Sequence, residues 1–176
     1  MTLPAGLSRI RLAVIVMGVS GCGKSTVAAG VADRLGLHFI DGDGLHPEAN
    51  VARMRAGVPL EDADRWPWLD RIGTCLADTK RWPQGLAVAC SALRRIYRDR
   101  LRSAAPGVRF VFLDGPSDLI AVRMASRSGH YMPSGLLASQ LQTLEPPGAD
   151  EPDVQRLEIE KPVEAVIGAA VRALRS

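Results

Sequence analysis

The clearest chemical pattern in the chain is a glycine-rich run near its start. Residues 18–25 read Gly-Val-Ser-Gly-Cys-Gly-Lys-Ser, which fits the pattern G-x-x-x-x-G-K-[ST] without a gap. Glycines let backbone N–H groups turn inward around phosphate oxygens. Lysine can reach the β- and γ-phosphates, and the serine hydroxyl can ligate Mg²⁺. We therefore predict a nucleotide site made by Gly18, Ser20, Gly21, Cys22, Gly23, Lys24, Ser25 and Thr26, with Cys22 as a small filler rather than a nucleophile.

The elements on either side of this run fit a phosphate-binding loop. Residues 12–17 form a continuous apolar stretch, as expected of a parallel strand covered on both faces. A helix is predicted from Ser25 to Leu35, and Gly36 follows where a left-handed residue commonly ends a helix. The N-terminus of such a helix adds its positive dipole end to the site.

Two acids, Asp41 and Asp43, follow a predicted second strand over residues 37–40. Ligands bind at the carboxyl ends of strands in open α/β sheets. One acid can hold Mg²⁺ and the other can accept the proton of an attacking hydroxyl. Asp114, after the apolar run 110–113, is a rival metal acid. We favour Asp41 because Asp114 precedes Gly-Pro and a helix start, where a turn or capping role suffices.

Two arginines, Arg123 and Arg127, lie four residues apart on one predicted helix and precede a stretch punctuated by Gly129 and Pro133. The guanidinium fork suits phosphate oxygens. A lid that closes over the phosphates would exclude water from the reaction. We predict that this segment is such a lid and that both arginines contact the nucleotide.

Other classes of nucleotide-binding protein lack support. Guanine recognition usually needs Asn-Lys-x-Asp, but the one asparagine, Asn50, is followed by Val51. The Leu-Ser-Gly-Gly-Gln signature of transporter ATPases is absent, and the chain is short for a motor. A sensor that only binds nucleotide would not need acids and arginines facing the phosphate loop. The pattern therefore favours a kinase that acts on a small molecule.

Composition agrees with a soluble globular enzyme. The chain has 176 residues, with 47% hydrophobic and 23% charged. Its three cysteines are widely spaced and predict no disulfide framework, which favours a reducing, cytoplasmic setting. No apolar run approaches the roughly 20 residues of a membrane span. The net charge is +3, but the arginines are dispersed, so we expect neither nucleic acid nor membrane as a partner.

Strand and helix signals alternate along the chain and predict a doubly wound α/β domain with a parallel sheet. Pro67 is expected to open one helix, and Ser91 is expected to cap another. On that second helix, Leu93, Tyr97, Leu101 and Ala104 share a predicted core face, and Arg94, Arg98 and Arg102 share another. The predicted strands are 12–17, 37–40, 86–90, 110–113 and 156–159, and the predicted helices are 25–35, 48–56, 67–81, 92–103, 117–128 and 162–174.

With these residues in place, the chain from about residue 12 to 176 resembles the small bacterial gluconokinases, which are related to shikimate kinase. The phosphate loop is common to many families. Three other blocks are more specific: His46-Pro47, Asp64-Arg65-x-Pro67-Trp68-Leu69 and Cys90-Ser91-Ala92-Leu93. The remaining support comes from Asp41-Gly42-Asp43, Leu45, Asn50, Met54, Gly57-Val58-Pro59-Leu60, Asp62, Arg94-Arg95, Tyr97-Arg98-Asp99, Gly129-His130-Tyr131-Met132-Pro133, Gln140, Leu144-Glu145 and Gly148-Ala149-Asp150-Glu151. Gly44 departs from the pattern, since the family often has another acid there.

The resemblance implies a three-layer kinase fold with a five-stranded parallel sheet, helices on both faces and a helical lid at about residues 123–145, all in one domain over 1–176. It implies transfer of phosphate from ATP, with Mg²⁺, to D-gluconate, giving 6-phospho-D-gluconate. A homodimer is compatible with it. The implied catalytic residues are Lys24, Asp43 and Arg127, the metal residues are Ser25 and Asp41, and the substrate residues are Asp43, His46, Arg53, Arg94, Arg98 and His130.

Two alternatives stay open at this point. One is a kinase for another small hydroxy acid such as shikimate, although a shikimate kinase would be expected to have three glycines where this chain has Cys90-Ser91-Ala92. The other is a nucleotide-binding protein without catalytic activity.

Overall fold

In the computed structural model, which describes residues 11–126 and 134–176, the strands form one parallel sheet in the order β2-β3-β1-β4-β5. The strands are β1 (Leu12–Met17), β2 (His38–Asp41), β3 (Gly85–Ala89), β4 (Arg109–Asp114) and β5 (Val154–Glu158). β1 lies at the centre and pairs with β3 and β4. The predicted α/β fold with five parallel strands is confirmed.

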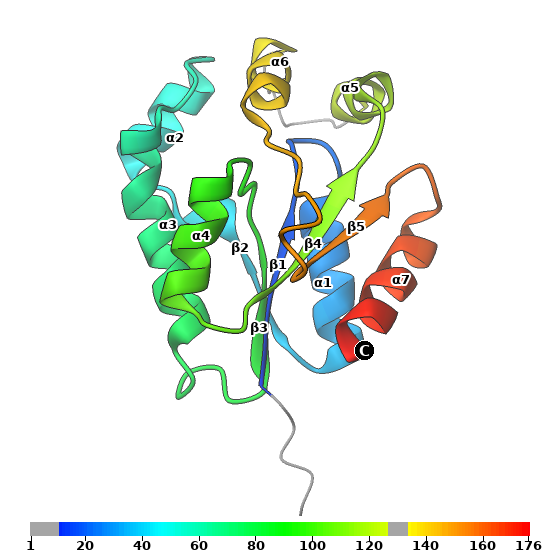
Figure 1. The fold of residues 1–176 in the computed structure, drawn as a ribbon. Coiled ribbons are helices and arrows are strands. Elements are labelled where there is room, and N and C mark those ends of the chain that lie inside the picture. Colours follow the sequence, from blue (N-terminus) through cyan, green and yellow to red (C-terminus); the bar gives the residue numbers. More distant parts are fainter. Residues whose placement is uncertain (1–10, 127–133) are drawn as a thin grey trace, which may run out of the picture.

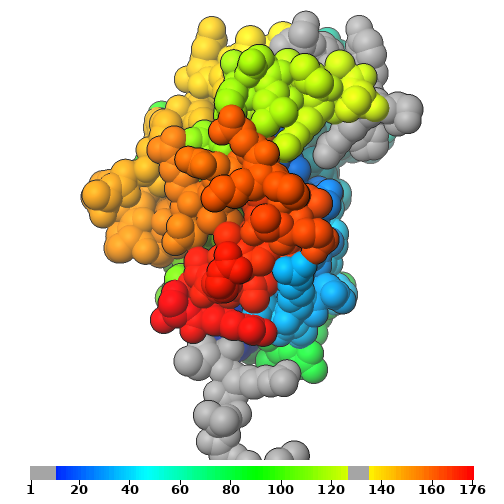
Figure 2. All heavy atoms as spheres, turned by 90° about the vertical axis from the view of Figure 1, so that its right-hand side faces the viewer, coloured from blue at the N-terminus to red at the C-terminus, as the bar shows by residue number. Residues whose placement is uncertain are grey.

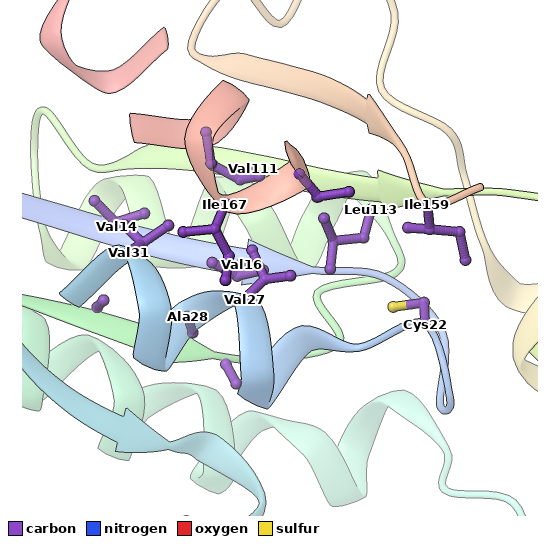
Figure 3. Close-up of a cluster of buried hydrophobic side chains, with 14 of the residues drawn as sticks. Val14, Val16, Cys22, Val27, Ala28, Val31, Val111, Leu113, Ile159 and Ile167 are labelled. Carbon is purple, nitrogen blue, oxygen red and sulfur yellow. The ribbon is translucent and has the colours of Figure 1, made fainter. Parts of the chain in front are cut away.

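Helices cover both faces of the sheet because side chains alternate along each buried strand. Val14 and Val16 of β1 face α1 (Lys24–Leu35) and α7 (Val163–Arg175), and Figure 3 shows this cluster. Ala13, Ile15 and Met17 face the other layer, α3 (Asp62–Ala77) and α4 (Arg95–Ala104). Two apolar clusters therefore hold the strand that leads into the phosphate loop.

Three further helices lie toward the carboxyl ends of the strands in Figure 1. They are α2 (Glu48–Arg55), α5 (Ser117–Ala125) and α6 (Ser134–Thr143). No separate helix was predicted for α6. Leu137, Leu141 and Leu144 recur there at helical spacing, and Leu137 is buried against the α1 side of the core. The predicted lid, at about residues 123–145, includes the end of α5 and all of α6, and its residues 127–133 lie outside the described part.

Two predicted helix starts are wrong, each for a local reason. α3 begins at Asp62 rather than at Pro67, because Glu61 and Asp64 form a capping box that starts the helix earlier. Pro67 therefore lies inside the helix. α4 begins at Arg95 rather than at Ala92, because Ala92 has a φ of 42°, in the left-handed region. Ser91 consequently caps no helix.

Candidate functional site

The phosphate loop joins β1 to α1, and the space beside Gly23 is open. Gly23 has a φ of 98°, and a Cβ atom added there would meet nothing within 4 Å. Lys24 is the first residue of α1, and its Nζ donates a hydrogen bond to the Val19 carbonyl at 3.0 Å. Cys22 is buried in the core below the loop (Figure 3). The loop thus has open space at Gly23 and is held by apolar packing at Cys22.

The loop that carries Asp41 and Asp43, called the acidic loop below, passes directly beside β3. Gly42 makes this close approach possible, because a Cβ atom there would lie 2.3 Å from the Ala89 carbonyl oxygen. Its own carbonyl accepts a hydrogen bond from Trp68 Nε1 at 2.7 Å. A short 3₁₀ helix, η1 (Gly42–Leu45), follows, and the Asp41 carboxylate accepts from the Asp43 amide at 3.0 Å. These contacts fix the positions of both acids relative to the sheet.

Asp41 joins the acidic loop to the phosphate loop. The Ser25 hydroxyl donates to Asp41 Oδ2 at 2.7 Å, so the two residues predicted for Mg²⁺ are direct neighbours. A hydroxyl and a carboxylate oxygen are donors of the hard type that Mg²⁺ prefers. Asp114, the rival acid, forms an ion pair with Arg156 instead. The donor chemistry and the placement fit a metal at Ser25 and Asp41.

A cavity of about 220 Å³ opens beside the phosphate loop. Arg123 lines it but donates its Nη2 to the Ile159 carbonyl at 2.7 Å, so in this structure it contacts the loop after β5. Lys161, which the sequence analysis did not select, also lines this cavity. The segment from β5 to α7 runs below α5 on the face shown in Figure 2. The cavity is lined by Cys22, Gly23, Thr26, Val27, Arg123, Ile159, Lys161, Val163 and Val166.

Two predicted residues, Arg127 and His130, lie outside the described residues. Their predicted contacts with nucleotide and substrate stay predictions. The adjoining helix α5 packs against the phosphate loop, because a Cβ atom added at Gly21 would lie 2.4 Å from Met124 Cγ.

His46 is buried rather than open to solvent. Its ring stacks on Trp68 with a centroid distance of 4.1 Å, and its Nδ1 lies 3.3 Å from Asn50 Nδ2. Burial, together with the positive charge of Arg65, lowers the pKa of His46 to about 4. The imidazole is therefore neutral at ordinary pH, and a neutral ring can both donate and accept a hydrogen bond.

Two of the arginines predicted to bind substrate carry carboxylate partners of their own. Arg53 pairs with Asp64 at 2.9 Å. Arg94 pairs with Asp62 and also with Glu145, to which its Nε lies at 3.1 Å. Both are partly exposed, so a ligand can still reach them, but it would share them with these acids.

Arg98 is a correction to the sequence analysis. Its side chain is 1% exposed, and its Nε and Nη2 donate to Glu151 at 2.7 and 2.6 Å. Nη1 donates to the carbonyls of Ala92 and Leu93. Every nitrogen of the guanidinium group is thus occupied within the protein. Arg98 does not face a substrate; it holds the loop that follows β3.

The sequence analysis missed Arg65 as a site residue. Arg65 is only 8% exposed, and its Nε has no hydrogen-bond partner among the described residues. Its guanidinium carbon lies 5.6 Å from the centre of the Tyr97 ring. A buried cation without full pairing is costly, so an anionic ligand would stabilise it. The available signal was its spacing, since Arg65 falls on the same face of α3 as Trp68, Leu69, Ile72 and Leu76.

Cys90, at the end of β3, lies among the charges of the site. Burial raises the pKa of its thiol to about 12; the Asp43 carboxylate also raises it, whereas a hydrogen bond with Ala92 and the charges of Lys24 and Arg65 lower it. The thiol is therefore not a nucleophile at ordinary pH.

Comparisons with known proteins find relatives over most of the chain. The chain is 48% identical over 159 residues to a gluconokinase of Gluconobacter oxydans, covering 90% of this chain and 89% of that protein. It is 41% identical to the thermoresistant gluconokinase of Escherichia coli, with 92% of each chain covered. The crystal structure of a gluconokinase from Sinorhizobium meliloti superposes with a TM-score of 0.86 at 45% identity, covering 95% and 93% of the two chains.

The chain belongs to the gluconokinase family. It is accordingly an enzyme of the kinase class. No protein-family model matches it. The shikimate kinase of Aquifex aeolicus, at 18% identity and a TM-score of 0.57, shares the fold alone. Among the described residues, no helix is both long and apolar enough to cross a membrane.

Proposed function

We propose that this protein transfers the γ-phosphoryl group of ATP to the terminal hydroxyl of D-gluconate, giving 6-phospho-D-gluconate and ADP. Identity of 41–48% to gluconokinases over most of the chain supports the substrate. The structural observation that carries the chemistry is the hydrogen bond from Ser25 to Asp41, which joins the acidic loop to the phosphate loop. Asp43, the proposed proton acceptor, follows Asp41 by two residues in the chain.

The reaction forms one bond and breaks one. The gluconate hydroxyl oxygen bonds to the γ-phosphorus while the bond from that phosphorus to the β,γ-bridging oxygen breaks. Asp43 accepts the hydroxyl proton, and the electron pair leaves on ADP. Lys24 moves from the Val19 carbonyl to the phosphate oxygens and stabilises their charge. Mg²⁺ held by Ser25 and Asp41 would neutralise charge on the phosphates.

We assign the remaining parts of the substrates to three features. Arg123 and Lys161 flank the cavity beside the loop, and this cavity is our candidate for the ribose and base of ATP. His46, in its neutral form, is suited to the hydroxyls of the polyol. Arg65 supplies the buried cation for the carboxylate of gluconate, whereas the arginines expected from the sequence to bind the substrate were Arg53, Arg94 and Arg98.

An acceptor panel tests the proposed function. ADP release is measured with gluconate, shikimate, AMP and no acceptor, using wild-type protein and Lys24→Ala as the matched inactive control. Gluconate should be the preferred acceptor, and Lys24→Ala should lower turnover by roughly 10²-fold or more. Preference for another acceptor, or near-normal turnover by a folded Lys24→Ala protein, would refute the proposal.

The role of Arg65 is tested with Arg65→Met, which keeps the apolar stem without the charge. Loss of a charged hydrogen bond to a carboxylate should raise the Michaelis constant for gluconate by about 10- to 100-fold. The Michaelis constant for ATP should change little. Arg175→Met, at an exposed position at the end of α7, is the control. Equal effects on both Michaelis constants would show that Arg65 does not contact the acceptor selectively.

The cytoplasmic location and the homodimer expected from the sequence stay predictions. Sedimentation of the purified protein across a concentration series measures the second.

A further inference from the structure

The segment from Gln140 to Glu145 contacts both sides of the site. At one end, the backbone amide of Ser20 in the phosphate loop donates to Gln140 Oε1 at 2.7 Å. At the other end, the amide of Glu145 donates to the Leu93 carbonyl at 2.9 Å. The segment begins in α6 and ends in the chain that follows it. It therefore connects the nucleotide loop to the loop after β3.

The Glu145 end is held by three separate contacts. Besides the backbone bond to Leu93, its carboxylate accepts from the Arg95 amide at 2.7 Å and from Arg94 Nε at 3.1 Å. Arg94 also pairs with Asp62 at the start of α3. This end is thus tied to both helices that cover the acceptor side of the sheet.

The Gln140 end is held by one polar contact and by packing. Leu137, one turn earlier on α6, is buried in the same apolar cluster as Val19 and Cys22 of the phosphate loop. The Gln140 side chain supplies the hydrogen-bond acceptor for the Ser20 amide, which sits at the outer turn of the loop. A movement of this loop on binding phosphate would act on α6 through that bond.

We propose that residues 140–145 couple nucleotide binding to acceptor binding, with Gln140 as a positioning residue for the phosphate loop. Two ligands are coupled when each favours the same arrangement of a shared element. Here that element has one anchor on Ser20 and the other on Leu93, Arg94 and Arg95. Nucleotide that orders the phosphate loop fixes the Gln140 end of the segment, and the segment in turn fixes the loop that carries Arg94. Arg94 is paired with Asp62 at the start of α3, on the acceptor side of the sheet. The inference rests on the proposed function, because gluconate is taken as the acceptor.

The test measures the dissociation constant of gluconate by calorimetry, with and without a non-hydrolysable ATP analogue and Mg²⁺. The ratio of the two constants is the coupling factor. Gln140→Met keeps the length of the side chain and removes the acceptor. Gln142→Met, on an exposed position of the same helix, is the matched control. Gln140→Glu restores an acceptor for the Ser20 amide.

We expect the analogue to tighten gluconate binding in the wild type and in Gln142→Met. In Gln140→Met the coupling factor should fall by about 3- to 10-fold, the value of one hydrogen bond, and Gln140→Glu should recover it. If Gln140→Met does not fold, Glu145→Gln weakens the opposite anchor and provides the same measurement.

The possible failures are distinguishable. A wild-type protein that neither binds nor phosphorylates gluconate would overturn the proposed function. A wild type that is active on gluconate but has a coupling factor of one would overturn only the inference. Unchanged coupling in a folded Gln140→Met protein would overturn it as well.

Discussion

At the scale of single residues, the site depends on side chains that already contact one another. Ser25 and Asp41 come from different elements, yet the hydroxyl and carboxylate lie at hydrogen-bond distance. Asp114 is at a comparable strand end but is paired with Arg156. The sequence analysis could rank these two acids only by their neighbours in the chain. The structure adds the contact between Ser25 of α1 and Asp41 of β2, which favours Asp41 as the proposed metal ligand.

This ranking leads to a prediction about the metal. Asp41→Asn removes a charged ligand, so it should raise the Mg²⁺ concentration for half-maximal activity by about 10-fold or more. Asp114→Asn should leave that concentration within about 2-fold of the wild type. The measurement is activity against Mg²⁺ concentration at saturating ATP and gluconate. The reverse pattern would make Asp114 the metal acid.

Arg65 and Arg98 show where residue patterns mislead. Both are buried, but Arg98 has a complete set of partners and Arg65 does not. Spacing of four residues placed Arg98 and Arg102 on one helix face, and both contact Glu151, but Arg94 precedes the helix. It could not reveal that Glu151, 53 residues away, would bury that face. Arg65 stood on the apolar face of a helix whose start was misplaced at Pro67, so its position was overlooked.

At the scale of elements, the strands and their succession along the chain were predictable from the sequence. The segments that connect them were less predictable. Continuous apolar runs of four to six residues can only be covered on both faces, which identifies β1, β3 and β4. The start of α4 depends on the left-handed φ of Ala92, a residue without any intrinsic preference for it. That conformation is held from a distance, by Arg98 donating to the carbonyls of Ala92 and Leu93.

The pair of Arg98 and Glu151 should therefore matter for stability. Burial alone would raise the pKa of Glu151, but hydrogen bonds from Arg98 and Arg102 lower it to about 2. Arg98→Met leaves the buried Glu151 carboxylate with fewer partners and should lower the free energy of unfolding by about 3–5 kcal/mol. Arg100→Met breaks an exposed pair with Asp70 and should cost less than about 1 kcal/mol.

Urea unfolding of the two variants measures this difference. The double variant Arg98→Met with Glu151→Leu removes both charges and should regain part of the loss, because no buried carboxylate is left uncompensated. If Arg98→Met proves no more costly than Arg100→Met, the pair does not support the loop after β3.

At the scale of the whole molecule, the fold gathers charge at the carboxyl end of the sheet and keeps it away from two apolar layers. β1 separates those layers, and its even and odd residues face different helices. The arrangement could be predicted from the alternation of apolar strands and helices. The distribution of buried charge could not, because it depends on segments such as the one around Glu151 folding back over α4.

His46 makes one consequence measurable on the entire protein. Its pKa is about 4 in the folded state, against about 6.5 for an exposed histidine. Between these two values the unfolded chain binds more protons at this residue than the folded one does. The folded state is therefore stabilised above about pH 6.5 and loses this contribution as the pH falls toward 4. The loss attributable to His46 alone should be about 2 kcal/mol at pH 5.

The comparison that isolates this effect uses His46→Phe, which keeps an aromatic ring to stack on Trp68 but cannot take up a proton. Other groups titrate alike in both proteins, so the difference between their unfolding free energies at each pH reports His46. From pH 7 to pH 5 the wild type should lose about 2 kcal/mol more than His46→Phe does. Parallel curves over this range would mean that His46 becomes protonated in the folded protein as readily as in the unfolded chain, which its stacked and buried position argues against.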